Sequence, residues 1–237
     1  MSALGDAVTW LNDPLNWQGA EGVPTLALKQ LRITAVAVGV GACIALPVAA
    51  LLGHYRRGGG FVVATSNVSR AVPTLALLIV FASTAVGFGD RATTVALVFF
   101  AIPPLLANTY TGVRGVDADV VESARGMGLS ERQVILRVEL PLAVPLIAAG
   151  LRTAAVQVVA TAPLAALVGG TTLGLVITSG FANQDYGKVV AGGILVAALA
   201  VLTEVVFVLL QRAVTPRRRS VRATPDPVEA TDAVPVS

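Results

Sequence analysis

The chain has 237 residues, of which 55% are apolar and 13% are charged, and its mean hydropathy is +0.77. This composition excludes an ordinary soluble domain, because an all-buried helical core would need amphipathic covering helices that the sequence lacks. The net charge of +3 comes without a basic patch interleaved with aromatic residues, so we expect a membrane protein with no nucleic-acid partner.

Residues 1–24 are expected to form an extracytoplasmic N-terminal segment. The first thirty residues have neither the basic start nor the compact apolar core of a cleaved signal peptide. The first span is therefore expected to act as its own insertion signal.

Long runs with few charges predict an all-α fold, a polytopic bundle of about five membrane-spanning helices. About 20 apolar residues suffice to cross a hydrocarbon core of roughly 30 Å as a helix. Spans are expected at residues 33–52, 72–89 (extended backward through residue 61), 92–113, 140–168 and 189–211. A sixth span over residues 161–181 stays open, although Gly169, Gly170 and a threonine pair interrupt it.

The basic residues predict the orientation. With the amino terminus outside, eleven arginines fall inside and four basic residues fall outside. Because Lys and Arg gather on the cytoplasmic side, the long loop at residues 113–140 and the carboxyl terminus are expected in the cytoplasm. The tail, residues 213–237, is rich in Pro, Arg, Thr and acidic residues and is expected to be disordered, its arginines anchoring the topology or touching anionic lipid.

The long polar loop is patterned as two short helices. Asp117 and Asp119 can cap the first helix, and Gly126 and Gly128 end it. Apolar residues at helical spacing predict one face, made of Val120, Val121, Ala124 and Met127.

The second helix of the loop is expected to open at Ser130, with Gln133 completing a capping box. Its apolar stripe comprises Val134, Ile135 and Val138, before the next span begins. An ordered helix pair in the one long loop of a membrane protein predicts a docking surface for a soluble partner, and hence a transport subunit driven by another chain.

Six residues of this loop and of the start of the next span resemble the EAA loop of importer-type ABC transporter permeases: Glu122, Ser123, Ala124, Gly128, Leu140 and Pro141. That family has Glu-Ala-Ala, and Ser123 departs from it, although a small residue suffices for close packing. The resemblance implies a type I importer permease fold whose coupling helix sits in a cleft of a cytoplasmic ATPase. Taken alone, Glu122 could equally be a solvated charge paired with Arg125.

The resemblance covers about residues 25–212, expected to form one permease domain with the EAA-like loop at 113–141. Residues 69–78 look like the motif opening the second span of permeases for glycine betaine, carnitine, choline and proline, and residues 145–154 are similar to the span after the loop in that group. Residues 168–174 differ from the glycine-rich segment of many relatives. The resemblance implies an importer of such compatible solutes, with a methionine or other amino-acid importer permease as the alternative.

Four residues at span depth stand out: Arg70, Pro73, Arg152 and Glu204. An unpaired charge there costs on the order of 3 kcal/mol or more, so the three charged side chains are expected to face protein or water. They line the translocation path or stabilise the bundle, for instance as an ion pair between Arg152 and Glu204. Pro73 breaks backbone hydrogen bonding, which is tolerated inside a bundle or beside a cavity.

No Gly-x-x-x-x-Gly-Lys-Ser/Thr motif occurs, so we expect no enzyme, with ATP hydrolysed by a separate subunit. No cofactor or metal is expected, since Cys43 is the single cysteine and His54 the single histidine. His54 is expected to be an inert flank of the first span.

The resemblance also implies partners: cytoplasmic ABC ATPase subunits, a second permease copy or paralogue, and an extracytoplasmic substrate-binding protein at a prokaryotic plasma membrane. Quaternary ammonium groups are usually held in aromatic cages; only 5% of the chain is aromatic, so solute selection is expected in the binding protein. A self-sufficient secondary carrier is the alternative from another class, but the inverted repeat that it should show is not evident.

Overall fold

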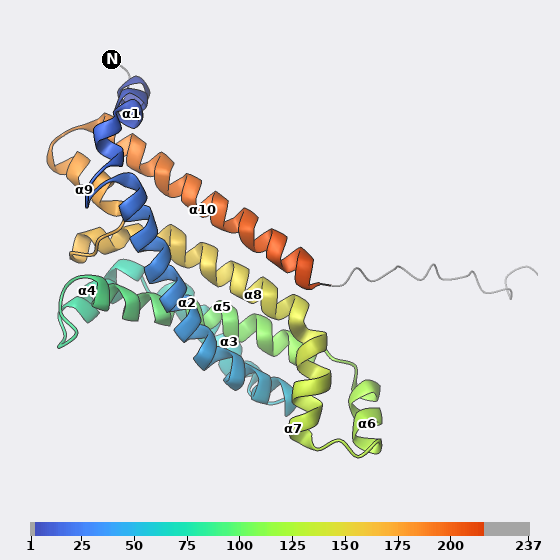
Figure 1. The fold of residues 1–237 in the computed structure, drawn as a ribbon. Helices are drawn as coiled ribbons and strands as arrows, with labels where there is room; N and C mark the ends of the chain where they lie inside the picture. Colours follow the sequence, from blue (N-terminus) through green and yellow to red (C-terminus); the bar gives the residue numbers. More distant parts are fainter. Residues whose placement is uncertain (1–2, 216–237) are drawn as a thin grey trace, which may run out of the picture.

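In the computed structural model, which describes residues 3–215, the chain is built from helices, and the described residues contain no β-strand (Figure 1). Four long helices form the bundle: α2 (Val23–His54), α5 (Asp90–Arg114), α8 (Leu140–Thr161) and α10 (Tyr186–Val214). Within the described range these four regions are long and apolar enough to cross a membrane. The predicted all-α membrane bundle is therefore confirmed.

Helix α8 is extended at both ends. The short helix α7 (Glu131–Val134) and the π turn η2 (Ile135–Glu139) precede it, and the 3-10 turn η3 (Ala162–Val168) follows it. The continuous helical region that is long and apolar enough to cross a membrane therefore runs from Glu131 to Val168. It includes the whole span predicted at residues 140–168.

The span predicted at residues 72–89 is divided in the structure. Helix α3 (Gly59–Ala71) ends before Val72, and helix α4 (Thr74–Ala82) begins after Pro73. Proline has no N–H to donate and forces the preceding residue out of the helical region, and Val72 has φ −81° and ψ 120° accordingly. The chain therefore passes this region as two short helices instead of one long span.

The region of the open sixth span is also too short to cross a bilayer. After η3, the chain turns at Gly169, with φ +77°, and forms α9 (Gly174–Ala182). Nine helical residues extend only about 14 Å. A Cβ at Gly174 would collide with the carbonyl oxygen of Pro163, so glycine is required where α9 begins against η3.

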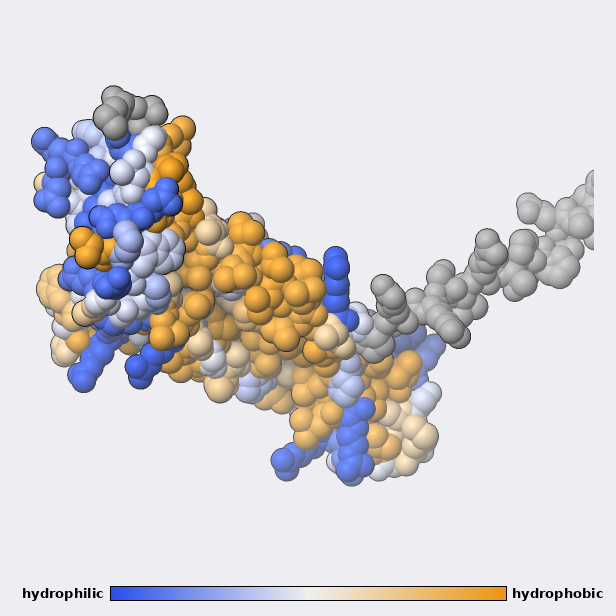
Figure 2. Space-filling view, turned by 45° about the horizontal axis from the view of Figure 1, so that its top comes forward, coloured by the Kyte–Doolittle hydropathy of each residue, from blue (hydrophilic) through white to orange (hydrophobic). Residues whose placement is uncertain are grey.

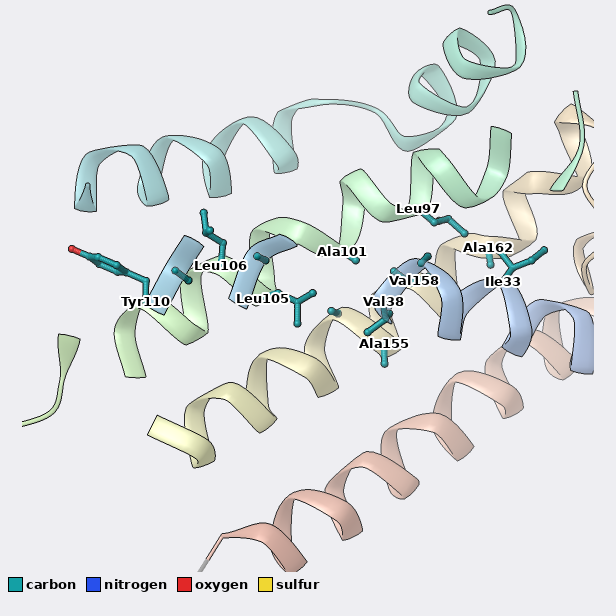
Figure 3. Packing of buried hydrophobic residues seen from close by; sticks show 14 of the residues in the cluster. Ile33, Val38, Leu97, Ala101, Leu105, Leu106, Tyr110, Ala155, Val158 and Ala162 are labelled. Atoms are coloured by element: carbon teal, nitrogen blue, oxygen red, sulfur yellow. The ribbon is translucent and has the colours of Figure 1, made fainter. Parts of the chain in front are cut away.

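The largest core lies where α2, α5 and α8 meet (Figure 3). Two glycines bring α5 and α8 close together: a Cβ at Gly112 would lie 3.1 Å from the Cβ of Ala143, and one at Gly150 would lie 2.8 Å from the Cβ of Asn108. Small residues at such contacts permit the close backbone approach on which membrane helices rely. Helices α5 and α8 are therefore expected to move together.

A buried side-chain amide joins the start of α2 to the end of α8 and to the segment before α9. Gln30 of α2 is fully buried; its Nε2 donates to the carbonyl of Val159 at 3.0 Å, and its Oε1 accepts the N–H of Leu173 at 3.1 Å. Because both ends of the amide are satisfied, this buried group avoids the cost of unpaired polar atoms.

The N-terminal segment is helical as well. Helix α1 (Ala3–Asn12) and the turn η1 (Pro14–Trp17) lie at the start of α2, where α1 packs against the beginning of α10 (Figure 1). A Cβ at Gly187 would lie 2.6 Å from that of Asp6. In Figure 2, hydrophilic side chains gather at the two ends of the molecule, with an apolar surface between them.

Candidate functional site

The long loop folds, as predicted, into two helices joined by a glycine turn. Helix α6 (Ala118–Gly126) and helix α7 lie beyond the end of α2 (Figure 1). The second helix does not stop before the next span, because α7 continues through η2 into α8. We call residues 117–139 the hairpin; its second helix is continuous with a helix of the bundle.

The predicted ends of α6 are confirmed. Asp117 caps it, since its Oδ1 accepts the N–H of Asp119 at 3.0 Å. At the other end Gly128 has φ +85°, and the N–H of Leu129 donates to the carbonyl of Ala124 at 3.2 Å. This is a Schellman ending, in which glycine takes the left-handed position without strain.

The hairpin has a small apolar core of its own. Gln133 completes the predicted capping interaction by accepting the N–H of Ser130 at 2.8 Å through its Oε1. The two helices then enclose a separate apolar cluster, with buried and partly buried members Val116, Val121, Ala124, Leu129, Val134 and Val138.

The outer side of α6 exposes apolar side chains. The predicted apolar face is split, because Val121 and Ala124 are buried whereas Val120 and Met127 are 43% and 75% exposed. A shallow groove of about 330 Å³ runs here, which we call the outer groove, lined by Asp119, Val120, Ser123, Ala124, Met127 and Val138. An exposed apolar groove at a polar end of the molecule is typical of a protein-docking surface.

Glu122 does not line the outer groove with its two sequence neighbours. It is exposed and lines a separate cleft of about 310 Å³ between the end of α2 and the hairpin, which we call the inner cleft. Ser123 and Ala124 instead line the outer groove. The structure thus places the three residues on two sides of one helix.

The last two residues of the resemblance lie at the base of α8. Leu140 packs with Ala50, Val113 and Ala143, which joins α8 to α2 and α5. Pro141 is exposed and follows directly after the π turn η2, at the start of α8.

Beside the inner cleft lies a charged cluster that sequence reasoning missed. His54, taken as an inert flank, has a side chain only 1% exposed; its Nδ1 lies 2.7 Å from Glu139 Oε2 and its Nε2 lies 2.8 Å from Glu131 Oε2. The first contact is a hydrogen bond; the second is a close approach whose alignment falls outside hydrogen-bond geometry. Glu131 in turn accepts two hydrogen bonds from Arg125, at 3.1 and 3.0 Å.

The cluster joins α2, α6, α7 and η2. The hydrogen bonds with Glu131 raise the pKa of the exposed Arg125 guanidinium above its usual value, and the charges of Glu139 and Glu122 add to this. No local pattern reveals such a cluster, since His54 and Glu139 are 85 positions apart in the chain. Within the described ranges no group of His, Cys, Asp and Glu is placed to hold a metal ion.

The predicted ion pair between Arg152 and Glu204 is present. Arg152 Nε lies 3.4 Å from Glu204 Oε1, and Arg152 Nη1 donates to Gln211 Oε1 at 3.1 Å. Both charged side chains are more than one-third exposed in the single chain. The pair links α8 to α10, which accounts for two of the charges at span depth.

The other two residues at span depth lie at the break between α3 and α4. Pro73 is the N-cap residue of α4. Arg70 lies in the last turn of α3, and its side chain is outside the described part of the structure.

At the far end of α2 from the hairpin lies a larger cleft of about 740 Å³. Lys29, Arg32 and Arg91 line it, together with apolar residues such as Val36. We call it the basic cleft. Asp90 also lines the basic cleft, and its Oδ1 accepts a hydrogen bond from the N–H of Thr171 at 2.8 Å.

Residues 41–220 match the family described as binding-protein-dependent transport system inner membrane component. The glycine betaine/carnitine/choline transport system permease protein OpuCB of Bacillus subtilis is 35% identical over 189 residues, covering 80% of this chain and 87% of that protein. The carnitine transport permease protein OpuCB of Listeria monocytogenes is 36% identical over 189 residues, covering 80% and 86%.

Solved structures share the fold. An inward-facing structure of the MetNI methionine ABC transporter matches with a TM-score of 0.71 at 22% identity, over 86% of this chain and all of that one. At this identity the likeness concerns the fold alone.

Proposed function

Since the chain belongs to the family of binding-protein-dependent transport system inner membrane components, we propose that it is the permease through which an ATP-driven importer takes up compatible solutes. As a member of that family it is an inner-membrane subunit without catalytic activity of its own, and a separate subunit hydrolyses ATP. The proposed solutes are glycine betaine, choline, carnitine or proline. The observation that carries the proposal is the identity of 35–36% with permeases of betaine, carnitine and choline systems over four-fifths of the chain.

A methionine or other amino-acid importer is the second candidate. It is favoured by the likeness to solved transporters of methionine and other amino acids, at 22% and 17% identity. The compatible-solute proposal has better support, because higher identity over a similar length weighs more than a shared fold.

The hairpin is the proposed contact with the ATPase. The outer groove offers an apolar surface with one acidic residue, Asp119, at its edge. Because α7 runs without a break into α8, a pull on the hairpin would tilt α8, and the Gly112 and Gly150 contacts would carry α5 with it. The helices would rock between outward- and inward-open states, and ATP hydrolysis would reset them.

The binding protein is proposed to dock at the opposite end. Lys29 and Arg32 lie near the start of α2 and Arg91 lies at the start of α5, whereas the hairpin lies beyond the end of α2. The three cations of the basic cleft favour an acidic partner surface. A second permease copy or a paralogue would complete the pathway, since residues 3–215 of one chain contain four long spans.

The solute can be identified in proteoliposomes that contain the permease, its ATPase and its binding protein. We expect glycine betaine, choline, carnitine or proline to stimulate ATP hydrolysis and to accumulate inside, whereas methionine will do neither. The measurements are phosphate release and uptake of labelled solute. Stimulation by methionine alone would assign the chain to the second candidate.

The proposed orientation can be tested by thiol labelling. In a Cys43→Ala background, Arg132→Cys in the hairpin should react with a membrane-impermeant maleimide only after cells are opened. Leu15→Cys, at the other end of the molecule and 77% exposed, should react in intact cells. The reverse pattern would place the hairpin outside and remove it from any contact with an ATPase.

A further inference from the structure

The imidazole of His54 is the feature that the proposed function leaves unused. It ends α2 and is buried between two carboxylates of the hairpin, Glu131 of α7 and Glu139 of η2. The side chain of Glu139 is itself only 4% exposed. A buried carboxylate is expected to have a charged or hydrogen-bonding partner, and here the partner is a titratable ring.

The π turn is what brings both carboxylates to the ring. Glu131 and Glu139 are eight positions apart, whereas two turns of regular α-helix hold about 7.2 residues. The wider turn at Ile135–Glu139 takes up the excess, so the two side chains face the same side. Turns of this kind occur frequently at functional sites.

The two close carboxylates favour a positively charged ring. A neutral imidazole has one N–H and one lone pair, whereas both ring nitrogens of His54 lie within 2.8 Å of a carboxylate oxygen. A doubly protonated ring is attracted to both carboxylates, whereas a neutral ring turns a lone pair toward one of them. With that charge, His54 and Arg125 balance the two carboxylates.

The remaining groups around the ring do not replace that charge. Tyr55 meets the ring edge-on at 4.9 Å, and Arg56 and Glu122 line the same cleft. Arg56 donates instead to the carbonyl of Val116 at 3.4 Å. On α5, Arg114 donates to Tyr110 at 2.8 Å.

We propose that His54 is a positioning residue that joins α2 to the hairpin, and that this junction is tight only while the ring is doubly protonated. The inference rests on the proposed function of the hairpin. When the ring loses a proton, one carboxylate faces a lone pair, the cluster gains a net negative charge, and the hairpin loosens from α2. Coupling between ATP hydrolysis and uptake therefore weakens as the pH on the hairpin side rises.

The test compares pH profiles of the assembled complex in proteoliposomes. Solute taken up per ATP hydrolysed should fall roughly tenfold in the wild type when the pH on the hairpin side is raised from acidic to alkaline. His54→Lys, which keeps its charge, should give a flat profile at the higher level. His54→Gln should give a flat profile at the lower level, and Arg132→Gln, an exposed charge change in the same hairpin, should keep the wild-type profile.

A purely structural role of His54 gives a different result. His54→Gln would then lower thermal stability but leave the pH profile parallel to that of the wild type, which would overturn the proposal. If His54→Gln does not assemble, Glu139→Gln serves instead, because removing the negative charge that faces Nδ1 should also flatten the profile. A wild-type profile in Glu139→Gln would contradict the proposal equally.

Hydrogen exchange separates this inference from the proposed function. If no solute stimulates ATP hydrolysis by the wild-type complex, the proposed function fails. Amide exchange of residues 118–139 still measures how firmly the hairpin is held to α2. At the higher pH, amides of the wild-type hairpin should exchange faster than those of the His54→Lys hairpin. Because both proteins are compared at the same pH, the intrinsic effect of pH on amide exchange cancels. Equal exchange in both proteins would overturn the junction.

Discussion

Replacing Glu122 by glutamine together with Gly128 by alanine will strongly reduce solute uptake while leaving the chain in the membrane. The first change removes a charge from the inner cleft, beside Arg125. The second places a Cβ at φ +85°, which costs about 1–2 kcal/mol for a residue other than glycine and distorts the turn that sets α6 against α7. We expect uptake and solute-stimulated ATP hydrolysis to fall at least about tenfold, equivalent to about 1.4 kcal/mol in coupling.

The controls for this double variant separate turn geometry from side-chain bulk. Gly126→Ala adds the same methyl group two positions away, in the helical part of α6, where nothing lies within 4 Å. It should transport like the wild type. Uptake by the double variant at the wild-type rate, with equal amounts in the membrane, would show that this segment does not couple the two activities.

Replacing Met127 by aspartate will prevent stable association with the ATPase. Met127 is the most exposed apolar side chain of the outer groove, at 75%, and contributes nothing to the core of the hairpin. A charge placed without a partner in a docked interface costs about 3 kcal/mol, roughly a hundredfold in affinity. The measurement is the amount of ATPase that co-purifies with the permease.

A matched substitution at the other end of the molecule controls for the added charge. Leu15→Asp also exchanges an exposed apolar residue for an acid, and it should leave the bound ATPase unchanged. Normal ATPase recovery with Met127→Asp would show that the outer groove is not the docking surface.

Features with a local signal could be predicted from the sequence. The long helices follow from apolar runs, and the hairpin follows from Asp117, Gly128 and the Ser130–Gln133 pair, since caps act within a few residues of the chain. The break at Pro73 also has a local cause, but the expected span was drawn across it because hydropathy alone does not register backbone geometry. The split of the α6 face was not predicted, because spacing groups Val120 with Val121 and only the packing of α7 decides between them.

Features that depend on distant contacts could not be predicted. The environment of His54 is made by carboxylates that lie far along the chain and face the ring only because η2 is a π turn. Gln30 likewise meets partners more than a hundred positions away. The pairing of Arg152 with Glu204 was predicted only because few charges occur in the apolar stretches.

The separate core of the hairpin has a consequence for how such transporters diversify. Val121, Ala124 and Val134 pack α6 against α7, whereas Val120 and Met127 on the exposed side of α6 are not part of that cluster. Substitutions at Val120 and Met127 can therefore follow changes in the ATPase surface that is proposed to bind them, while the membrane-spanning helices stay unchanged.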